Sequence, residues 1–211
     1  MELVWIGHSC FRLRGKDATV ITDPCTKSSG YALSRASADL VTISNDHPHH
    51  NAKDEVAGDP TVLDGPGEYE VHGVIVTGVR TDPPRSDGTR MRNTAYIIDV
   101  DDVRICHLGD LANLPSADQI ELMKDAHVLL VPVGGHCTIG APEAVEVISQ
   151  IEPKIVVPMH YATDVSSAEL EGVERFLREM GLTSPERQAR LNITHGSLPA
   201  EPTVALLEHR G

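Results

Sequence analysis

Residues 39–52 read DLVTISNDHPHHNA, an apolar run of strand character followed at once by a polar segment with three histidines, His47, His49 and His50. A short run rich in Val and Ile predicts a buried β-strand. Imidazole nitrogen is a common ligand of zinc and similar ions. The stretch therefore predicts a metal-binding loop at a strand end, an altered version of such a loop, or a polar turn rich in imidazole.

Polar residues follow three later apolar runs in the same way, at 107–110, at 134–136 and at His160. Because strand ends of one sheet tend to share an edge, these side chains could converge on one site. Imidazole nitrogen and carboxylate oxygen suit zinc, and zinc lowers the pKa of a bound water to about 7. The residues that supply these ligand atoms are His47, His49, His50, Asp110 and His160.

The rest of the chain reads as β-hairpins first and as alternating strands and helices later. Strands are expected within 2–6, 17–23, 61–79, 94–110, 127–135 and 154–161, and helices within 116–126, 141–153 and 166–181. Ser116 is the expected N-cap of the first helix, and Pro153 is expected to end the second. This order fits α/β or α+β layers better than a pure β-sandwich.

Composition limits the class of protein. The 211 residues fit one domain, and 18 Lys and Arg against 31 Asp and Glu give a net charge of −13. An acidic balance disfavours nucleic acid as a partner. No apolar run approaches the length of a membrane span and no signal peptide is evident, so we expect a cytoplasmic protein without a membrane partner. The four cysteines are expected to be buried, reduced thiols.

Seven segments together resemble the metallo-β-lactamase-fold metallohydrolases, in particular a bacterial zinc-dependent hydrolase-like branch that is similar to ascorbate-phosphate lactonases. They are WIGHSCFRL (5–13), VITDP (20–24), TISNDHPHHN (42–51), GPGEYEV (65–71), ICHLGDL (105–111), VLLVPVGGHCTIGAPEA (128–144) and IVVPMHY (155–161). The resemblance implies a single domain over residues 1–211. It also implies a four-layer αββα sandwich with the metal site at one edge of the paired sheets.

The family's ligands are a His-x-His-x-Asp-His motif, a later bridging Asp and a final His. The corresponding positions here are Asn45, His47, His49, His50, Asp110 and His160. Asn45 and His49 therefore depart from the motif. A further family histidine belongs to the loop before the strand at 94–100, where this chain has none, although Asp82 or Asp87 could substitute.

These losses fall mainly on one of the family's two metal positions, which keeps only His47 and Asp110. The other position keeps a plausible mononuclear set of three nitrogens and one oxygen, made of His49, His50, Asp110 and His160. The resemblance therefore implies one ion more readily than two. Zinc is the expected metal, with manganese or iron as alternatives.

Further residues are candidates for contacts around the metal or with the substrate, namely His8, Asn45, Asp46, His107 and His136. His8 could equally be a strand-end histidine bonded to backbone, and His136 a surface loop residue. His107 is expected to orient a ligand. A cluster made of Arg80, Arg85, Arg90 and Arg92 could bind a phosphate or carboxylate, or form a solvated basic turn.

Two functions remain open at this point. The first is a metal-dependent hydrolase that uses metal-activated water on a small ester, lactone or phosphate ester, which could be anionic. Asp110 and His49 would be its catalytic residues, His49 standing where the family has an Asp that can act as acid or base. The second is a catalytically degenerate member that binds a ligand or partner without turnover.

Overall fold

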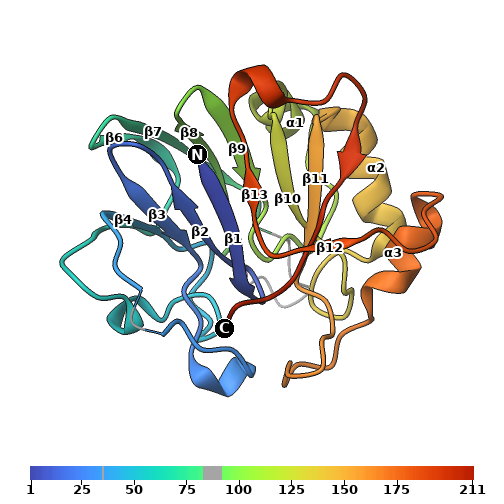
Figure 1. Cartoon of the computed structure of the whole chain (residues 1–211), viewed down its shortest axis with the longest axis horizontal. Helices are drawn as coiled ribbons and strands as arrows, with labels where there is room; N and C mark the ends of the chain where they lie inside the picture. Colours follow the sequence, from blue (N-terminus) through green and yellow to red (C-terminus); the bar gives the residue numbers. More distant parts are fainter. Residues whose placement is uncertain (35, 83–91) are drawn as a thin grey trace.

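The computed structural model describes residues 1–34, 36–82 and 92–211, so Arg85, Asp87 and Arg90 lie outside the described residues. Two β-sheets pack face to face (Figure 1). The first sheet has the order β13-β1-β2-β3-β4-β5. Its strands are β1 (Glu2–Gly7), β2 (Cys10–Arg14), β3 (Thr19–Thr22), β4 (Leu40–Thr42), β5 (Thr61–Leu63) and β13 (Leu191–Asn192).

The second sheet has the order β14-β11-β10-β9-β8-β7-β6. Its strands are β6 (Gly67–Val71), β7 (Val74–Arg80), β8 (Thr94–Val100), β9 (Val103–His107), β10 (Val128–Pro132), β11 (Ile155–Met159) and β14 (Thr203–Val204). The strands β9, β10 and β11 are parallel, so their carboxyl ends meet at one edge. A small parallel pair is formed by β12 (Arg187–Gln188) and β15 (Leu206–Leu207).

The strand β1 of the first sheet is buried on both faces. Along β1, Leu3 and Trp5 face the core between the sheets, whereas Val4 and Ile6 face a second, smaller core. Successive strand residues point to opposite faces, which explains the unbroken apolar run of β1. The smaller core is covered mainly by residues of the segments 25–34 and 36–38 and by Val56. The 3-10 turns η1 (Lys27–Ser29) and η2 (Lys53–Glu55) lie before and after β4.

The α-helices α1 (Ala117–Met123), α2 (Ala141–Ile151) and α3 (Val173–Glu179) lie beside the second sheet (Figure 1). The predicted N-cap is confirmed, because Ser116 Oγ accepts the Gln119 amide at 3.3 Å and Gln119 Oε1 accepts the Ser116 amide at 2.7 Å. The helix α2 ends before Pro153, as predicted. The layered sandwich expected from the sequence is confirmed, and the described outer layer over the first sheet is made of loops and the 3-10 turns η1 and η2.

The prediction of a helix from residue 166 was wrong, because α3 begins at Val173. The preceding segment makes backbone hydrogen bonds to other loops instead. The Glu171 amide donates to the Gly134 carbonyl at 2.8 Å, and the Glu171 carbonyl accepts the Ala162 amide at 2.9 Å. Tertiary backbone pairing thus overrides the helical pattern of residues 166–172.

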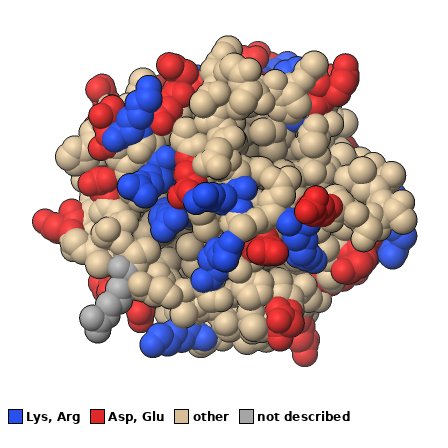
Figure 2. All heavy atoms as spheres, in the orientation of Figure 1, with Lys and Arg blue, Asp and Glu red and all other residues tan. Residues whose placement is uncertain are grey.

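The surface carries both signs of charge. On the face in Figure 2, basic and acidic side chains are intermixed. Among the helices that the structure describes, none combines the length and the apolar character needed to cross a bilayer.

Candidate metal centre

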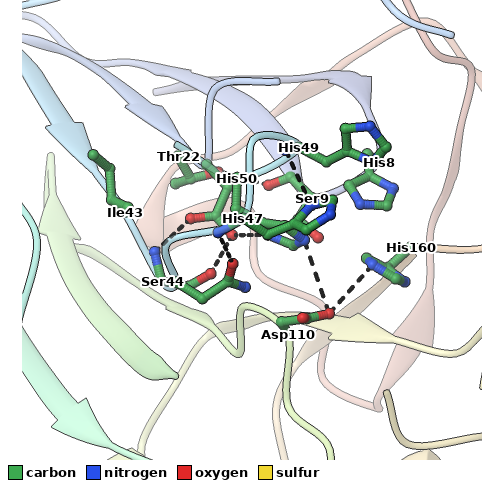
Figure 3. A network of polar contacts seen from close by, with 12 residues as sticks. His8, Ser9, Thr22, Ile43, Ser44, His47, His49, His50, Asp110 and His160 are labelled. Carbon is green, nitrogen blue, oxygen red and sulfur yellow. Dashed lines mark hydrogen bonds and ion pairs between the residues drawn. The ribbon is translucent and has the colours of Figure 1, made fainter. Parts of the chain in front are cut away.

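Four side chains that could ligate a metal meet where strands of both sheets end (Figure 3). They are His8 after β1, His50 in the loop after β4, Asp110 after β9 and His160 after β11. One ring nitrogen of each of the three histidines lies within 4.8 Å of the others. Asp110 Oδ1 lies 3.3 Å from His160 Nε2 and 3.8 Å from His50 Nε2.

A backbone hydrogen bond holds His8 and His160 side by side. The His8 carbonyl accepts hydrogen bonds from Trp5 Nε1 at 3.0 Å and from the His160 amide at 3.1 Å. The His8 and His160 rings are 4.0 Å apart between centroids. Both residues have a φ of 53°, a left-handed conformation that is uncommon outside glycine and that clusters at functional sites.

His50 is oriented by a buried carboxylate, Asp23. The Asp23 side chain accepts His50 Nδ1 at 2.8 Å and the Ser44 amide at 2.7 Å. Burial alone would raise the pKa of Asp23, but the hydrogen bond from His50 and the nearby His107 lower it below its usual value. Because Nδ1 is engaged, Nε2 of His50 faces Asp110, which is the carboxylate–histidine pairing found behind many metal ligands.

Asp110 is positioned by Asn93. Asn93 Oδ1 accepts the Asp110 amide at 2.9 Å, while Nδ2 donates to Thr81 Oγ1 at 2.8 Å and to the Leu108 carbonyl at 3.0 Å. Asp110 Oδ1 is buried and has no hydrogen-bond partner among the described residues. Burial raises the pKa of Asp110. A buried carboxylate oxygen without a donor calls for a ligand such as a cation.

Burial keeps two of the imidazoles in their neutral, metal-binding form. It lowers the pKa of His8, and the neighbouring His160 lowers it further. Burial together with the neighbouring His50 lowers the pKa of His160 to about 3. Within the described part of the chain, His160 Nδ1 is also buried without a partner.

The four side chains lie in a cavity of about 560 Å³. Other residues on its wall are Asn45, Asp46, His47, His49, Arg92, His136, Cys137, Ala168 and Glu169. Ala168 and Glu169 belong to the segment for which the sequence predicts a helix, so sequence reasoning missed this part of the wall.

His47 and His49 line the cavity outside the group of three imidazoles. Asn45 Oδ1 accepts the His47 amide at 2.8 Å, and His47 Nδ1 accepts the His49 amide at 3.2 Å. His49 Nε2 lies 3.3 Å from Ser28 Oγ. The sequence predicts His49 as a ligand together with His50 and His160. In the structure, the ring nitrogen that lies within 4.8 Å of those of His50 and His160 belongs to His8.

Besides His47, two further exposed candidates, Asp46 and His136, lie on the wall of the cavity. Asp46 Oδ1 forms an ion pair with Arg92 Nη1 at 3.2 Å. Among the described arginines, Arg92 is the one that lines the cavity. His136 has a φ of 64° in the loop after β10.

Two candidates point away from the cavity. His107 is fully buried, and its Nε2 lies 2.8 Å from the Ser9 carbonyl, so it supports the residue next to His8. The Asp82 carboxylate accepts the Asn93 amide at 2.8 Å and does not line the cavity.

All four cysteines lie in the described ranges and are free thiols. Cys10, Cys25 and Cys106 are buried as predicted, but Cys137 is exposed, so the prediction was wrong for this residue. Cys137 lies on the wall of the cavity, between the core residues Val133 and Ile139 of the same loop.

Sequence reasoning also missed Asp23 and Asn93. Asp23 directly follows β3 and is the one of the two that carries a sequence signal, a carboxylate at a strand end. Asn93 carries no such signal, because its role depends on contacts with Thr81, just after β7, and Leu108, just after β9.

Two facing mixed sheets with imidazoles and a carboxylate at one edge are the architecture of the metallo-β-lactamase fold. A family model described as "Beta-lactamase superfamily domain" matches residues 2–160. A structure from Thermotoga maritima, assigned to the Zn-dependent hydrolases of the metallo-β-lactamase superfamily, superposes with a TM-score of 0.82. It is 35% identical, and the match covers 99% of each chain.

Two curated relatives point to the same superfamily. The UPF0173 metal-dependent hydrolase of Methanoculleus marisnigri is 30% identical, covering 91% of this chain and 94% of the relative. A UPF0173 protein of Pyrococcus abyssi is 30% identical, covering 84% and 91%. The chain therefore belongs to the metallo-β-lactamase superfamily, in the family of the UPF0173 metal-dependent hydrolases, and the resemblance seen in the sequence is confirmed.

Proposed function

We propose that the protein hydrolyses a small ester, lactone or phosphate ester with one metal ion held by His8, His50, Asp110 and His160. The observation that carries the proposal is the convergence of three imidazole nitrogens within 4.8 Å, with an unpartnered carboxylate oxygen 3.3 Å from one of them. The side chains come from four separate segments of the chain. Only the tertiary fold brings them together, which supports a built site.

The donor atoms fit a single zinc-like ion. Three nitrogens and one oxygen form a common zinc set, with manganese and iron as alternatives. Neutral His8 and His160 need not lose a proton to bind. Asp110 supplies the negative charge that a divalent cation would satisfy. His8 takes the place that the sequence suggests for His49.

A bound ion supplies Lewis-acid polarisation of the substrate oxygen and lowers the pKa of water. The protein's own contribution is to hold the substrate beside it. Asn45 Nδ2 and one terminal nitrogen of Arg92 are buried without a hydrogen-bond partner in the described ranges, and both residues line the cavity. These two donors could orient an anionic oxygen of the substrate. The cavity volume of about 560 Å³ suits a small molecule.

Metal content and hydrolysis together test the proposal. Protein purified without added metal should hold about one ion per chain. It should turn over at least one member of a panel of esters, lactones and phosphate esters. Asp110→Asn should lower kcat/KM by about 100-fold or more, because it removes the carboxylate ligand of the ion. The control, Asp54→Asn, changes an exposed carboxylate in η2 and should leave turnover unchanged.

The alternative outcome is also informative. If the protein binds the ion but hydrolyses nothing in the panel, the ligand-binding alternative replaces the proposal. If no ion binds, the metal site itself is wrong.

A further inference from the structure

Cys137 lies in a second group of potential ligands beside the first. Its Sγ, an Asp110 carboxylate oxygen and a His160 ring nitrogen all lie within 4.8 Å of one another. The two groups share His160, so the thiol lies beside a candidate ligand of the ion. Zinc sites can expand from four to five ligands, so a thiol beside Asp110 and His160 can join the nitrogen and oxygen ligands.

The loop that carries Cys137 is anchored on both sides of this group. At one end, Gly134 packs so closely that a Cβ there would lie 2.2 Å from the His160 carbonyl oxygen. At the other end, the Ile139 amide donates to the Leu111 carbonyl at 2.8 Å, next to Asp110. The backbone therefore holds the loop against the two residues that Cys137 approaches.

The turn between these anchors is itself ordered. The Thr138 amide and Oγ1 each donate to the Gly135 carbonyl at 3.2 Å, and the Gly135 amide donates to the Ile139 carbonyl at 3.2 Å. Cys137 sits within this turn on the cavity wall. The unpaired carboxylate oxygen of the proposed metal site belongs to the same group, since Asp110 Oδ1 is buried without a donor in the described residues.

We propose that the Cys137 thiolate is a further ligand of the ion held by Asp110 and His160. This rests on the proposed function for the presence of the ion and adds a sulfur to its nitrogen and oxygen ligands. Coordination forms a metal–sulfur bond and releases the thiol proton to solvent. Thiolate ligands favour zinc over manganese and other hard ions, so the site should select zinc.

Cobalt substitution tests the ligand directly, without relying on turnover. Cobalt(II) bound to a thiolate shows a sulfur-to-metal charge-transfer band in the near ultraviolet. Wild-type protein with one equivalent of cobalt should show this band, and Cys137→Ser should bind cobalt without it. Cys25→Ser is the matched control, because the Cys25 thiol lies near His50 but outside the group of Cys137, and it should keep the band.

A second measurement uses the unaltered protein. Zinc should slow alkylation of Cys137 by iodoacetamide by about 10-fold or more, as read by peptide mass mapping, because a ligated sulfur is a poor nucleophile. Zinc should also displace manganese from the site in competition.

The outcomes separate the two proposals. If cobalt binds at one equivalent with no charge-transfer band, or if Cys137→Ser retains the band, the sulfur ligand is wrong and the metal-dependent hydrolase stands. If neither cobalt nor zinc binds to the wild-type protein, both proposals fail.

Discussion

The contact between His50 and Asp23 shows how one buried residue prepares another for its task. Asp23 is fully buried, and its charge is stabilised by hydrogen bonds from His50 Nδ1 and the Ser44 amide. The same bond fixes the ring of His50 so that Nε2 faces Asp110. Residues behind a metal ligand act on affinity through orientation and basicity.

Asp23→Asn should therefore weaken metal binding by about 10–100-fold, because an amide neither fixes the tautomer of His50 as strongly nor raises its basicity. Competition with a chromogenic chelator measures the change. Asp17→Asn, on an exposed turn, is the control and should bind as the wild type does. Equal affinities for the two variants would show that Asp23 does not act on the site.

At the scale of elements, the connection between β10 and α2 brings a loop onto the site. Gly134 permits this approach, because its Cα faces the backbone of His160 and Tyr161 with no space for a side chain. The loop ends at Gly140, the N-cap of α2. Its position is therefore set by backbone contact rather than by local sequence preference.

Gly134→Ala should lower the free energy of unfolding by about 1–3 kcal/mol, because the new methyl group must displace the His160 carbonyl or the loop. Urea unfolding followed by circular dichroism measures this. Gly196→Ala provides the comparison, since no atom lies within 4 Å of a Cβ placed there. A similar, small change in both variants would argue that the loop moves freely.

At the scale of the whole molecule, the candidate ligands join the two sheets. His8 and His50 follow strands of the first sheet, whereas Asp110 and His160 follow strands of the second. An ion that binds all four would hold the layers together at their shared edge. Ligands that bind only the native state stabilise it by mass action.

Removal of the ion by a chelator should lower the melting temperature. At a free ion concentration of 100 times Kd, the lost stabilisation is about 2.7 kcal/mol. For a chain of this size that corresponds to a decrease of about 5–11 °C. Differential scanning calorimetry with and without chelator measures it. The double variant His50→Ala and His160→Ala should melt at one temperature in both conditions. A wild type that is equally insensitive would contradict the bridging role.

The sequence by itself determined the elements and the general location of the site. Strands such as β4 and β11, and the capped helix α1, follow from patterns among adjacent residues. The same patterns placed His50, Asp110 and His160 at strand ends, where a shared edge was to be expected.

Only the tertiary structure decided which side chains meet. The grouping of His8 with His160 depends on a hydrogen bond between their backbones, and that of Cys137 depends on a glycine packed against His160. The late start of α3 depends on a backbone hydrogen bond from the Glu171 amide to the Gly134 carbonyl. Each of these contacts joins segments far apart in the chain. Local propensity and spacing encode no such distances, because they arise only when the two sheets pack.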